Sequence, residues 1–220
     1  MTGSKVLVLG GTGPAGICLL RELAYRNHAT VVYARNPYKI PKDLVSNPLI
    51  EVIKGEMDDL VALSTAVDQS STVISLLGPN INDGKINPTL FADCYKSSVF
   101  PLMRRHGVRR IIAMGTISIV RPEDRWTFFQ SMVVLFEAQG LDWTVFRIAS
   151  IPGKSDEASW RKDREDGEVF VGWVGEKGWT GVQKRGALTR WLVDAAEGGA
   201  EEWVGKMPAV SRLAGSKNKS

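Results

Sequence analysis

The chain has 220 residues, of which 44% are hydrophobic, so it can bury one sizeable core and is short for two domains. The net charge of +4 suits an anionic ligand but is too small to indicate nucleic-acid binding by itself. No apolar run approaches the roughly 20 residues of a membrane span, and structure is expected too early to leave room for a secretion signal. Two cysteines and two histidines offer neither a disulfide framework nor metal-ligand spacing. We therefore expect one soluble, cytoplasmic domain without a metal and without membrane or nucleic-acid partners.

The first half of the chain alternates short apolar runs with helical patterns, which is typical of a parallel sheet covered by helices on both faces. The expected strands are Val6 to Leu9, Thr30 to Ala34, Ile50 to Ile53, Thr72 to Leu77, Ile111 to Met114 and Trp143 to Ile148. Four helices are expected. The first follows the glycine turn at Ile17 to Ala24, and the second begins after Asp58. The third spans Pro88 to His106 with a kink or restart at Pro101, and the fourth spans Trp126 to Gln139. This order predicts a Rossmann-type, doubly wound α/β sheet over residues 1–150.

The remaining residues are expected to form a small α/β portion that covers the substrate, at 151–210, within the same single domain. Its expected elements are a strand at Glu168 to Val174, a helix at Ala187 to Glu197 and a short strand at Trp203 to Val204. Residues 211–220 are polar and are expected to be a disordered tail.

A glycine-rich turn follows the first strand: Gly10-Gly11-Thr12-Gly13-Pro14-Ala15-Gly16. In this setting Gly10 makes the tight turn, Gly13 lets the backbone approach a pyrophosphate, and Gly16 lets the helix pack on the strand. The phosphates would lie at the positive amino end of the helix. The sequence therefore predicts dinucleotide binding by a set of turn residues: Gly10, Thr12, Gly13, Pro14, Ala15 and Gly16.

The second strand ends at Arg35, where an NAD-specific site would usually have an acid. Arg35 offers a planar cation to a 2′-phosphate and Lys39 could add a second charge, so we expect NADP, bound as NADPH. The alternative is that Arg35 stacks on adenine or faces solvent. Ligands lie beyond the carboxyl ends of parallel strands, which predicts further cofactor contacts after the third and fourth strands. These are Glu56, Met57, Leu76, Leu77 and Gly78.

Three segments resemble strand and helix borders of a known family: Leu76 to Asn80, His106 to Ala113 and Gly140 to Arg147. With the glycine turn, they resemble the atypical short-chain dehydrogenase/reductase superfamily, in particular its NmrA-like and biliverdin/flavin reductase-like members. The resemblance covers about residues 5 to 210. It implies a Rossmann fold and an NAD(P) cofactor, and says much less about the reaction.

The chain departs from this superfamily in its catalytic residues. Classical members use a Tyr-x-x-x-Lys pair, and the only such spacing, Tyr38 and Lys42, falls on the adenine side where no hydride is transferred. The resemblance implies that Thr116 contacts the nicotinamide end, and Ser118 could be a second donor. The alternative for both hydroxyls is that they cap backbone groups at a strand end. A His of the flavin reductase-like branch is replaced here by the run Ala149 to Pro152.

All seven tryptophans lie at or beyond Trp126, which hints at an apolar or aromatic, even polycyclic, substrate. Trp143 and Trp191 are expected in the core. The candidates for a substrate pocket are then Trp126, Trp160, Trp173 and Trp179.

Three functions fit these observations. The first is an NADPH-dependent reductase of a small or polycyclic organic substrate that takes its proton from water. The second is an isomerase, cyclase or rearrangement enzyme that keeps NADP without using its redox chemistry, as the missing Tyr-Lys pair favours. The third is a non-enzymatic NADP sensor like the NmrA-like regulators. Fold does not separate them, and the sequence does not indicate an oligomeric state.

Overall fold

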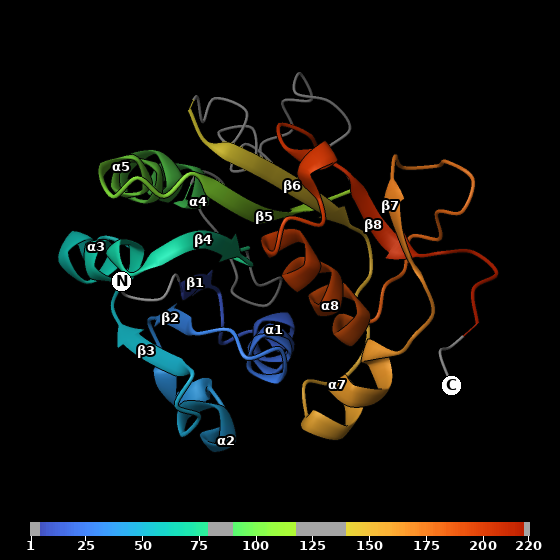
Figure 1. Ribbon diagram of the computed structural model, residues 1–220, viewed down its shortest axis with the longest axis horizontal. Coiled ribbons are helices and arrows are strands. Elements are labelled where there is room, and N and C mark those ends of the chain that lie inside the picture. The colour runs from blue at the N-terminus through green and yellow to red at the C-terminus, as the bar shows by residue number, and fades with distance from the viewer. Residues whose placement is uncertain (1–4, 79–89, 118–139, 218–220) are drawn as a thin grey trace.

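The computed structural model describes residues 5–78, 90–117 and 140–217, which form an eight-stranded sheet (Figure 1). The strand order is β3-β2-β1-β4-β5-β6-β8-β7, and the pairings are parallel except for β7 with β8. The strands are β1 (Lys5–Leu9), β2 (Thr30–Ala34), β3 (Ile50–Lys54), β4 (Ser70–Ser75), β5 (Arg110–Thr116), β6 (Asp142–Ile148), β7 (Val169–Gly172) and β8 (Ala209–Arg212). The doubly wound α/β sheet predicted from the sequence is confirmed.

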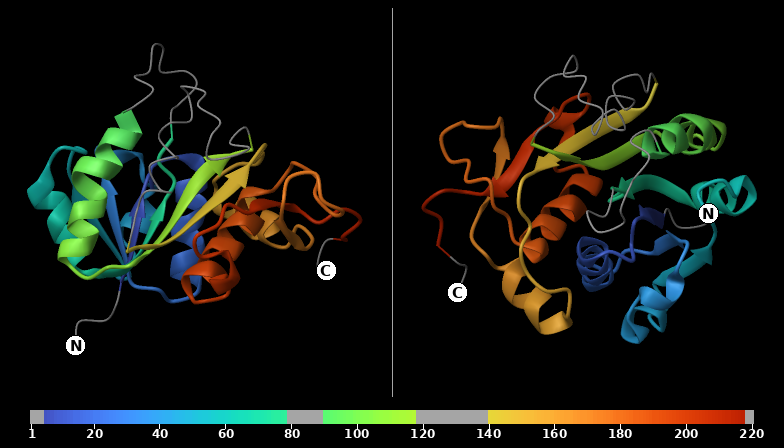
Figure 2. Two further views of the ribbon diagram at one scale, coloured as in Figure 1. Left: turned by 90° about the horizontal axis from the view of Figure 1, so that it is seen from above. Right: turned by 180° about the vertical axis from the view of Figure 1, so that it is seen from behind.

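Helices cover both faces of the sheet (Figures 1 and 2). One face carries α3 (Leu60–Asp68), α4 (Leu90–Cys94), the π-helical turn Tyr95–Val99 and α5 (Phe100–Arg105). The other carries α1 (Pro14–Tyr25), α2 (Lys42–Val45) and α8 (Arg185–Ala196), with α7 (Glu157–Arg164) packed beside α1 and α8. Short 3-10 turns span Pro37–Lys39 and Glu201–Trp203. None of the helices in the described ranges is long and apolar enough to cross a membrane.

The two layers of helices give the molecule two hydrophobic cores, one on each face of the sheet. Along β1, Leu7 and Leu9 belong to the core under α3 and α5, whereas Val6 and Val8 belong to the core under α1 and α8. A strand covered on both faces is therefore apolar at every position, as β1 is from Val6 onward. This burial fixes β1, and with it the turn that follows its last residue.

The long helical pattern around Pro101 differs from the prediction in one respect. Pro101 lies in the first turn of α5, and the expected kink takes the form of the π-helical turn Tyr95–Val99. Proline has no N–H to donate to the carbonyl four residues earlier, so the hydrogen-bond pattern must change at this point. The expected helix at 126–139 lies outside the described residues.

The carboxyl-terminal portion contains two errors of the sequence prediction. Trp203 ends a 3-10 turn instead of beginning a strand, and the last strand is β8, which includes Ser211. The expected disordered tail therefore does not begin at residue 211. The Leu213 N–H donates to the Glu168 carbonyl at 2.8 Å, and the Ala214 N–H donates to the Gly178 carbonyl at 2.8 Å. These are long-range contacts, which a local pattern does not reveal.

Helix α7 was not predicted, because its composition is polar and only Trp160 and Asp163 are buried. Its amino end does carry a sequence signal. Asp156 caps the helix by accepting a hydrogen bond from the Ser159 N–H at 2.9 Å.

Candidate functional site

The turn between β1 and α1 lies against the end of β4. The Leu76 N–H donates to the Leu9 carbonyl at 2.9 Å, and Gly10 has a φ of +80°. A Cβ added at Gly10 would lie 2.8 Å from the carbonyl carbon and oxygen of Leu76. Only glycine fits this position, both for its backbone conformation and for the close approach. The turn therefore lies between β1 and β4, where the strand order reverses and where ligands bind in this class of sheet.

Gly16 and Gly13 differ in what surrounds them. A Cβ at Gly16 would lie 2.3 Å from the Gly10 carbonyl oxygen and 2.6 Å from the Gly11 Cα, so packing of the helix on the turn requires glycine there. A Cβ at Gly13 would meet only the Gly10 oxygen, at 3.7 Å. Packing among the described residues does not require glycine at position 13, and the approach of a pyrophosphate to its backbone stays a prediction.

The amino end of α1 suits an anion. Gly13 is its N-cap residue, and no described side chain caps it. Pro14 occupies the first helical turn, which contains no acidic residue. The unpaired N–H groups and the helix dipole are therefore available to phosphate oxygens. Pro14 is exposed and Thr12 is half-buried beside it, whereas the Ala15 side chain is buried in the core, leaving only its backbone for a ligand.

Arg35 and Lys39 lie beyond the carboxyl end of β2, on a turn anchored by the buried side chain of Ile40. The Lys39 N–H donates to the Asn36 carbonyl at 3.1 Å. Both cationic side chains are exposed, and neither forms an ion pair with a described acid. The turn thus presents two exposed cations on the adenine side of the glycine turn.

Glu56 and Met57 are held in place by Tyr33 on β2. The Tyr33 hydroxyl donates to the Glu56 carbonyl at 2.6 Å, and burial raises the pKa of this tyrosine to about 12. A Cβ at Gly55 would lie 2.2 Å from the same hydroxyl oxygen. Met57 packs partly buried against the core and Glu56 is exposed. Tyr33 and Gly55 were not predicted from the sequence, because tyrosine is common in strands and glycine is common in loops. Only the contact between them shows that they position Glu56 and Met57.

The residues after β4 rest on a buried pair of hydroxyls. Ser75 Oγ and the Tyr95 hydroxyl form a hydrogen bond of 2.6 Å, and the Leu77 N–H donates to Ser75 Oγ at 3.5 Å. Leu76 is buried, Leu77 half-buried and Gly78 exposed, and a Cβ at Gly78 would lie 3.3 Å from Met114 Cε. The predicted contact residues Leu76, Leu77 and Gly78 thus lie on a short segment that is held at Ser75 by these hydrogen bonds.

Thr116 is the last residue of β5 and is exposed at the same edge of the sheet. It pairs in register with Ile148 at the end of β6. The structure therefore brings the glycine turn, Leu76 to Gly78 and Thr116 to the carboxyl ends of three neighbouring strands. Ser118 lies outside the described residues.

The four tyrosines of the chain all lie in the described ranges, and each has a place away from the end of β5. Tyr25 packs on Trp160 beside α1, and Tyr33 and Tyr95 are buried and hydrogen-bonded. Tyr38 is 79% exposed on the turn after β2. No tyrosine is therefore placed to act as the acid of a Tyr-Lys pair beside Thr116.

The candidate pocket tryptophans do not gather in one place. Trp160 is buried, with its ring 5.7 Å from that of Tyr25. Trp173 packs on Trp203 at the outer strand β7, five strand positions from β1. Trp179 is half-buried near Gly181, and Trp126 lies outside the described residues. Within the described parts of the chain, no group of three His, Cys, Asp or Glu side chains is arranged to hold a metal.

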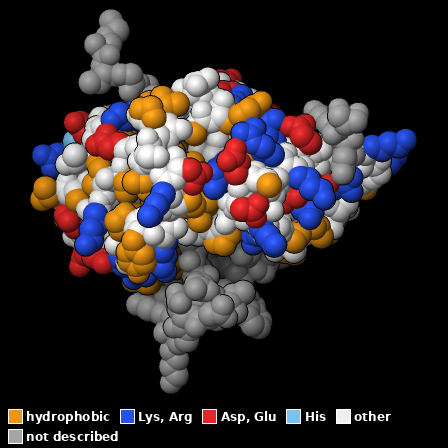
Figure 3. Space-filling view, turned by 90° about the horizontal axis from the view of Figure 1, so that it is seen from below, with side chains coloured by type: hydrophobic (Ala, Val, Ile, Leu, Met, Phe, Trp, Pro, Cys, Tyr) orange, Lys and Arg blue, Asp and Glu red, His pale blue; other side chains and the backbone are white. Residues whose placement is uncertain are grey.

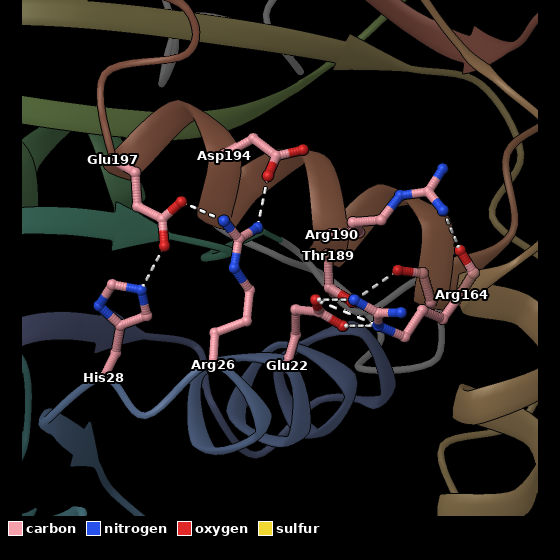
Figure 4. A network of polar contacts seen from close by, with 9 residues as sticks. Glu22, Arg26, His28, Arg164, Thr189, Arg190, Asp194 and Glu197 are labelled. Atoms are coloured by element: carbon pink, nitrogen blue, oxygen red, sulfur yellow. Dashed lines mark hydrogen bonds and ion pairs between the residues drawn. The ribbon is translucent and has the colours of Figure 1, made fainter.

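A polar network holds the flank of α1 against α7 and α8 (Figure 4). Glu22 on α1 is fully buried and pairs with Arg164 of α7. Arg26 pairs with Asp194 and with Glu197, and His28 Nε2 lies 2.6 Å from Glu197 Oε1. These contacts hold the helix whose amino end follows the glycine turn.

Residues 10–174 match the sequence model of the NAD(P)H-binding family. The chain belongs to this family. The matched span contains the glycine turn, Arg35, the segment after β4 and Thr116, which are the parts brought together above. No curated protein matches the chain.

Solved structures share the fold over nearly the whole chain. A Rossmann-fold NAD(P)-binding family protein from Shigella flexneri has a TM-score of 0.70 at 20% identity and covers 99% of this chain and 97% of its own. A short-chain dehydrogenase/reductase from Veillonella parvula, solved with NADP, has a TM-score of 0.72 at 18% identity, covering 99% and 98%. An oxidoreductase from Lactococcus lactis has a TM-score of 0.69 at 14% identity, covering 97% and 92%. The expected Rossmann-type fold and the NAD(P)-binding family are confirmed.

Proposed function

We propose that the protein is an NADPH-dependent reductase of a small organic substrate. The observation that carries the proposal is the space at Gly13, where an added Cβ would meet no described atom closer than 3.7 Å, at an amino end of α1 that no described side chain caps. This space fits the pyrophosphate of a dinucleotide. The face of the molecule in Figure 3 mixes acidic and basic side chains, which favours a small-molecule partner over nucleic acid on that face.

Arg35 and Lys39 favour NADP over NAD. Both are exposed cations beyond the end of β2 that form no ion pair with a described acid, and the ribose of a dinucleotide lies there in Rossmann folds, so a 2′-phosphate would neutralise them. The position has no acid to accept hydrogen bonds from a 2′-hydroxyl. A guanidinium can bind phosphate through two parallel hydrogen bonds, so Arg35 is the main determinant.

Bound NADPH would supply a hydride to the substrate. The protein's part is to orient the reactants at the carboxyl ends of β4 and β5, with the Thr116 hydroxyl as a hydrogen-bond donor there. No tyrosine is placed to donate a proton, so the substrate takes its proton from water. Flavins, quinones and conjugated enones accept hydride in this way without a strong protein acid.

The same arrangement of the tyrosines favours a second candidate, in which NADP is held but not consumed. The protein would then catalyse an isomerisation, cyclisation or rearrangement beside Thr116.

One assay tests the proposal and separates the two candidates. Purified protein is incubated with NADPH and a panel of flavins, quinones and enones, and absorbance is followed at the dihydronicotinamide band. A reductase consumes NADPH and forms reduced product, whereas the Gly13→Val variant, whose side chain fills the open space, does not. Conversion of a substrate without loss of NADPH would establish the second candidate and end the first.

A further inference from the structure

A cavity of about 440 Å³ lies between the segment after β6, helix α7 and the amino end of α8. Three lysines line it, together with two acids and a glycine: Lys154, Lys162, Lys184, Asp163, Asp166 and Gly153. We call this cavity the lysine pocket. It shares no lining residue with the glycine turn.

The charges in the lysine pocket are unevenly paired. Asp166 Oδ2 lies 3.7 Å from Arg212 Nε, and Asp163 Oδ1 lies 4.0 Å from Lys184 Nζ. Each acid thus has a cation of its own. Lys154 and Lys162 form no ion pair with an acid in the described residues, and both are exposed. Lys162 also acts on Asp163, and Lys154 on Asp156, in the direction that lowers the pKa of each carboxyl. The lining still has one more cation than acid, which favours an anion.

One wall of the pocket is fixed by a close contact between Gly153 and Asp163. Gly153 has a φ of +121°, and a Cβ there would lie 2.4 Å from Asp163 Oδ2. The Asp163 side chain is mostly buried, and this burial raises its pKa. The carboxylate therefore packs directly on the loop backbone, which places the neighbouring Lys154 at the mouth of the pocket.

The pocket lies beside α1 and α8, and the segment that leads to it begins at the end of β6: the Arg21 side chain donates to the Ser155 carbonyl at 3.1 Å. Thr116 pairs in register with Ile148, and two residues later the Ser150 carbonyl accepts a hydrogen bond from the Gln183 N–H at 2.9 Å. The next residue is Lys184, which is the N-cap of α8. The chain thus connects the end of β6, which pairs with Thr116, to the two segments that line the pocket.

We propose that the lysine pocket binds a carboxylate or phosphate group of the substrate, whose reducible part lies beside Thr116. The substrate class is thus an organic acid or a phosphate ester. The assignment of this anion to a substrate rests on the proposed reductase function. The affinity of the pocket for an anion does not depend on that function.

The first test measures anion binding without any reaction. Inorganic phosphate, and separately acetate, is titrated by calorimetry into protein saturated with NADP, so that the glycine turn is already occupied. The double variant Lys154→Gln/Lys162→Gln should weaken binding about 10-fold. The matched control, Lys177→Gln/Lys217→Gln, removes the same charge from exposed positions outside the pocket and should bind as the unchanged protein does.

The second test uses pairs of substrates that differ only in the acid group. Carbonyl and enone acids, and phosphate esters, are compared with their methyl esters or parent alcohols in the NADPH assay. The unchanged protein should prefer the charged member about 10-fold in kcat/KM, and the Lys154→Gln/Lys162→Gln variant should lose that preference. The control variant should keep it.

The outcomes distinguish the two proposals. If no compound consumes NADPH but phosphate or acetate binding depends on Lys154 and Lys162, the reductase proposal fails and the anion site stands. If NADPH is consumed with equal preference for acids and esters, and the lysine variant binds both ions as well as the control does, the pocket proposal is overturned.

Discussion

Both carboxylate oxygens of Glu22, a fully buried side chain on α1, accept hydrogen bonds from the Arg164 guanidinium on α7. The Nε atom of Arg164 lies 2.9 Å from Oε2, and its Nη2 atom lies 3.2 Å from Oε1. The guanidinium also lies over the ring of Tyr25, 4.4 Å from its centroid. The helix that presents the anion site is thus joined to α7 by a buried charge.

Removing one partner of this pair should destabilise the protein strongly. Arg164→Leu leaves the Glu22 carboxylate buried without a cation, which is expected to lower the free energy of unfolding by about 3 to 5 kcal/mol. The double variant Glu22→Leu/Arg164→Leu leaves no buried charge and should recover most of this loss. Urea denaturation measures the free energy of unfolding of both variants. A single variant as stable as the original protein would contradict a stabilising role for Arg164 beside the buried Glu22.

Arg35→Ala should change the choice of cofactor. We expect its affinity for NADPH to fall at least about 10-fold, because a charge-assisted contact with the 2′-phosphate is lost. NADH has no such phosphate, so its affinity should barely change. Fluorescence titration of both cofactors measures the ratio, and equal losses for the two would contradict the assigned role.

Alanine at Gly16 should lower stability, whereas alanine at Gly13 should weaken cofactor binding. Gly16→Ala places a Cβ 2.3 Å from the Gly10 carbonyl, so the variant should lose about 3 kcal/mol of stability or more. Gly13→Ala meets nothing closer than 3.7 Å and should fold normally, yet bind NADPH more weakly. Thermal unfolding and cofactor titration of both variants give the comparison. Normal NADPH binding by folded Gly13→Ala would argue against a pyrophosphate at this position.

Asp163 should make the protein less stable as pH rises. Burial, its largest influence, raises the pKa of this carboxyl in the folded state, while the unfolded chain keeps the usual value of about 4. From that value upward the unfolded state loses its proton first, so stability falls until pH exceeds the folded-state pKa. Asp163→Asn should lack this decline. Unfolding free energies of both proteins, measured from acid to neutral pH, check the sign.

Local patterns in the sequence predicted the places of the turn and of Arg35. The turn from Gly10 to Gly16 directly follows β1 and Arg35 directly follows β2, as expected, while their roles in cofactor binding stay predictions. Tyr33 and Gly55 were missed because they meet across two strands. The strand expected at Trp203 was wrong because two apolar residues do not distinguish a strand from a 3-10 turn.

Polar elements were the other source of error. Helix α7 has few apolar residues, and its place depends on Trp160 and on the charge of Arg164, whose partner Glu22 is far away in the chain. Periodicity detects helices that bury an apolar face. It does not detect one that is held by ion pairs.

The antiparallel pairing of β7 with β8 also bears on how the chain is made. On the ribosome, β7 emerges well before β8, yet β8 is its pairing partner and separates it from β6. Domains generally fold as units during synthesis, from the amino-terminal end onward. Here the outer part of the sheet must wait for β8, so a nascent chain halted after α8 would carry β7 without its neighbour and be a substrate for chaperones or proteases.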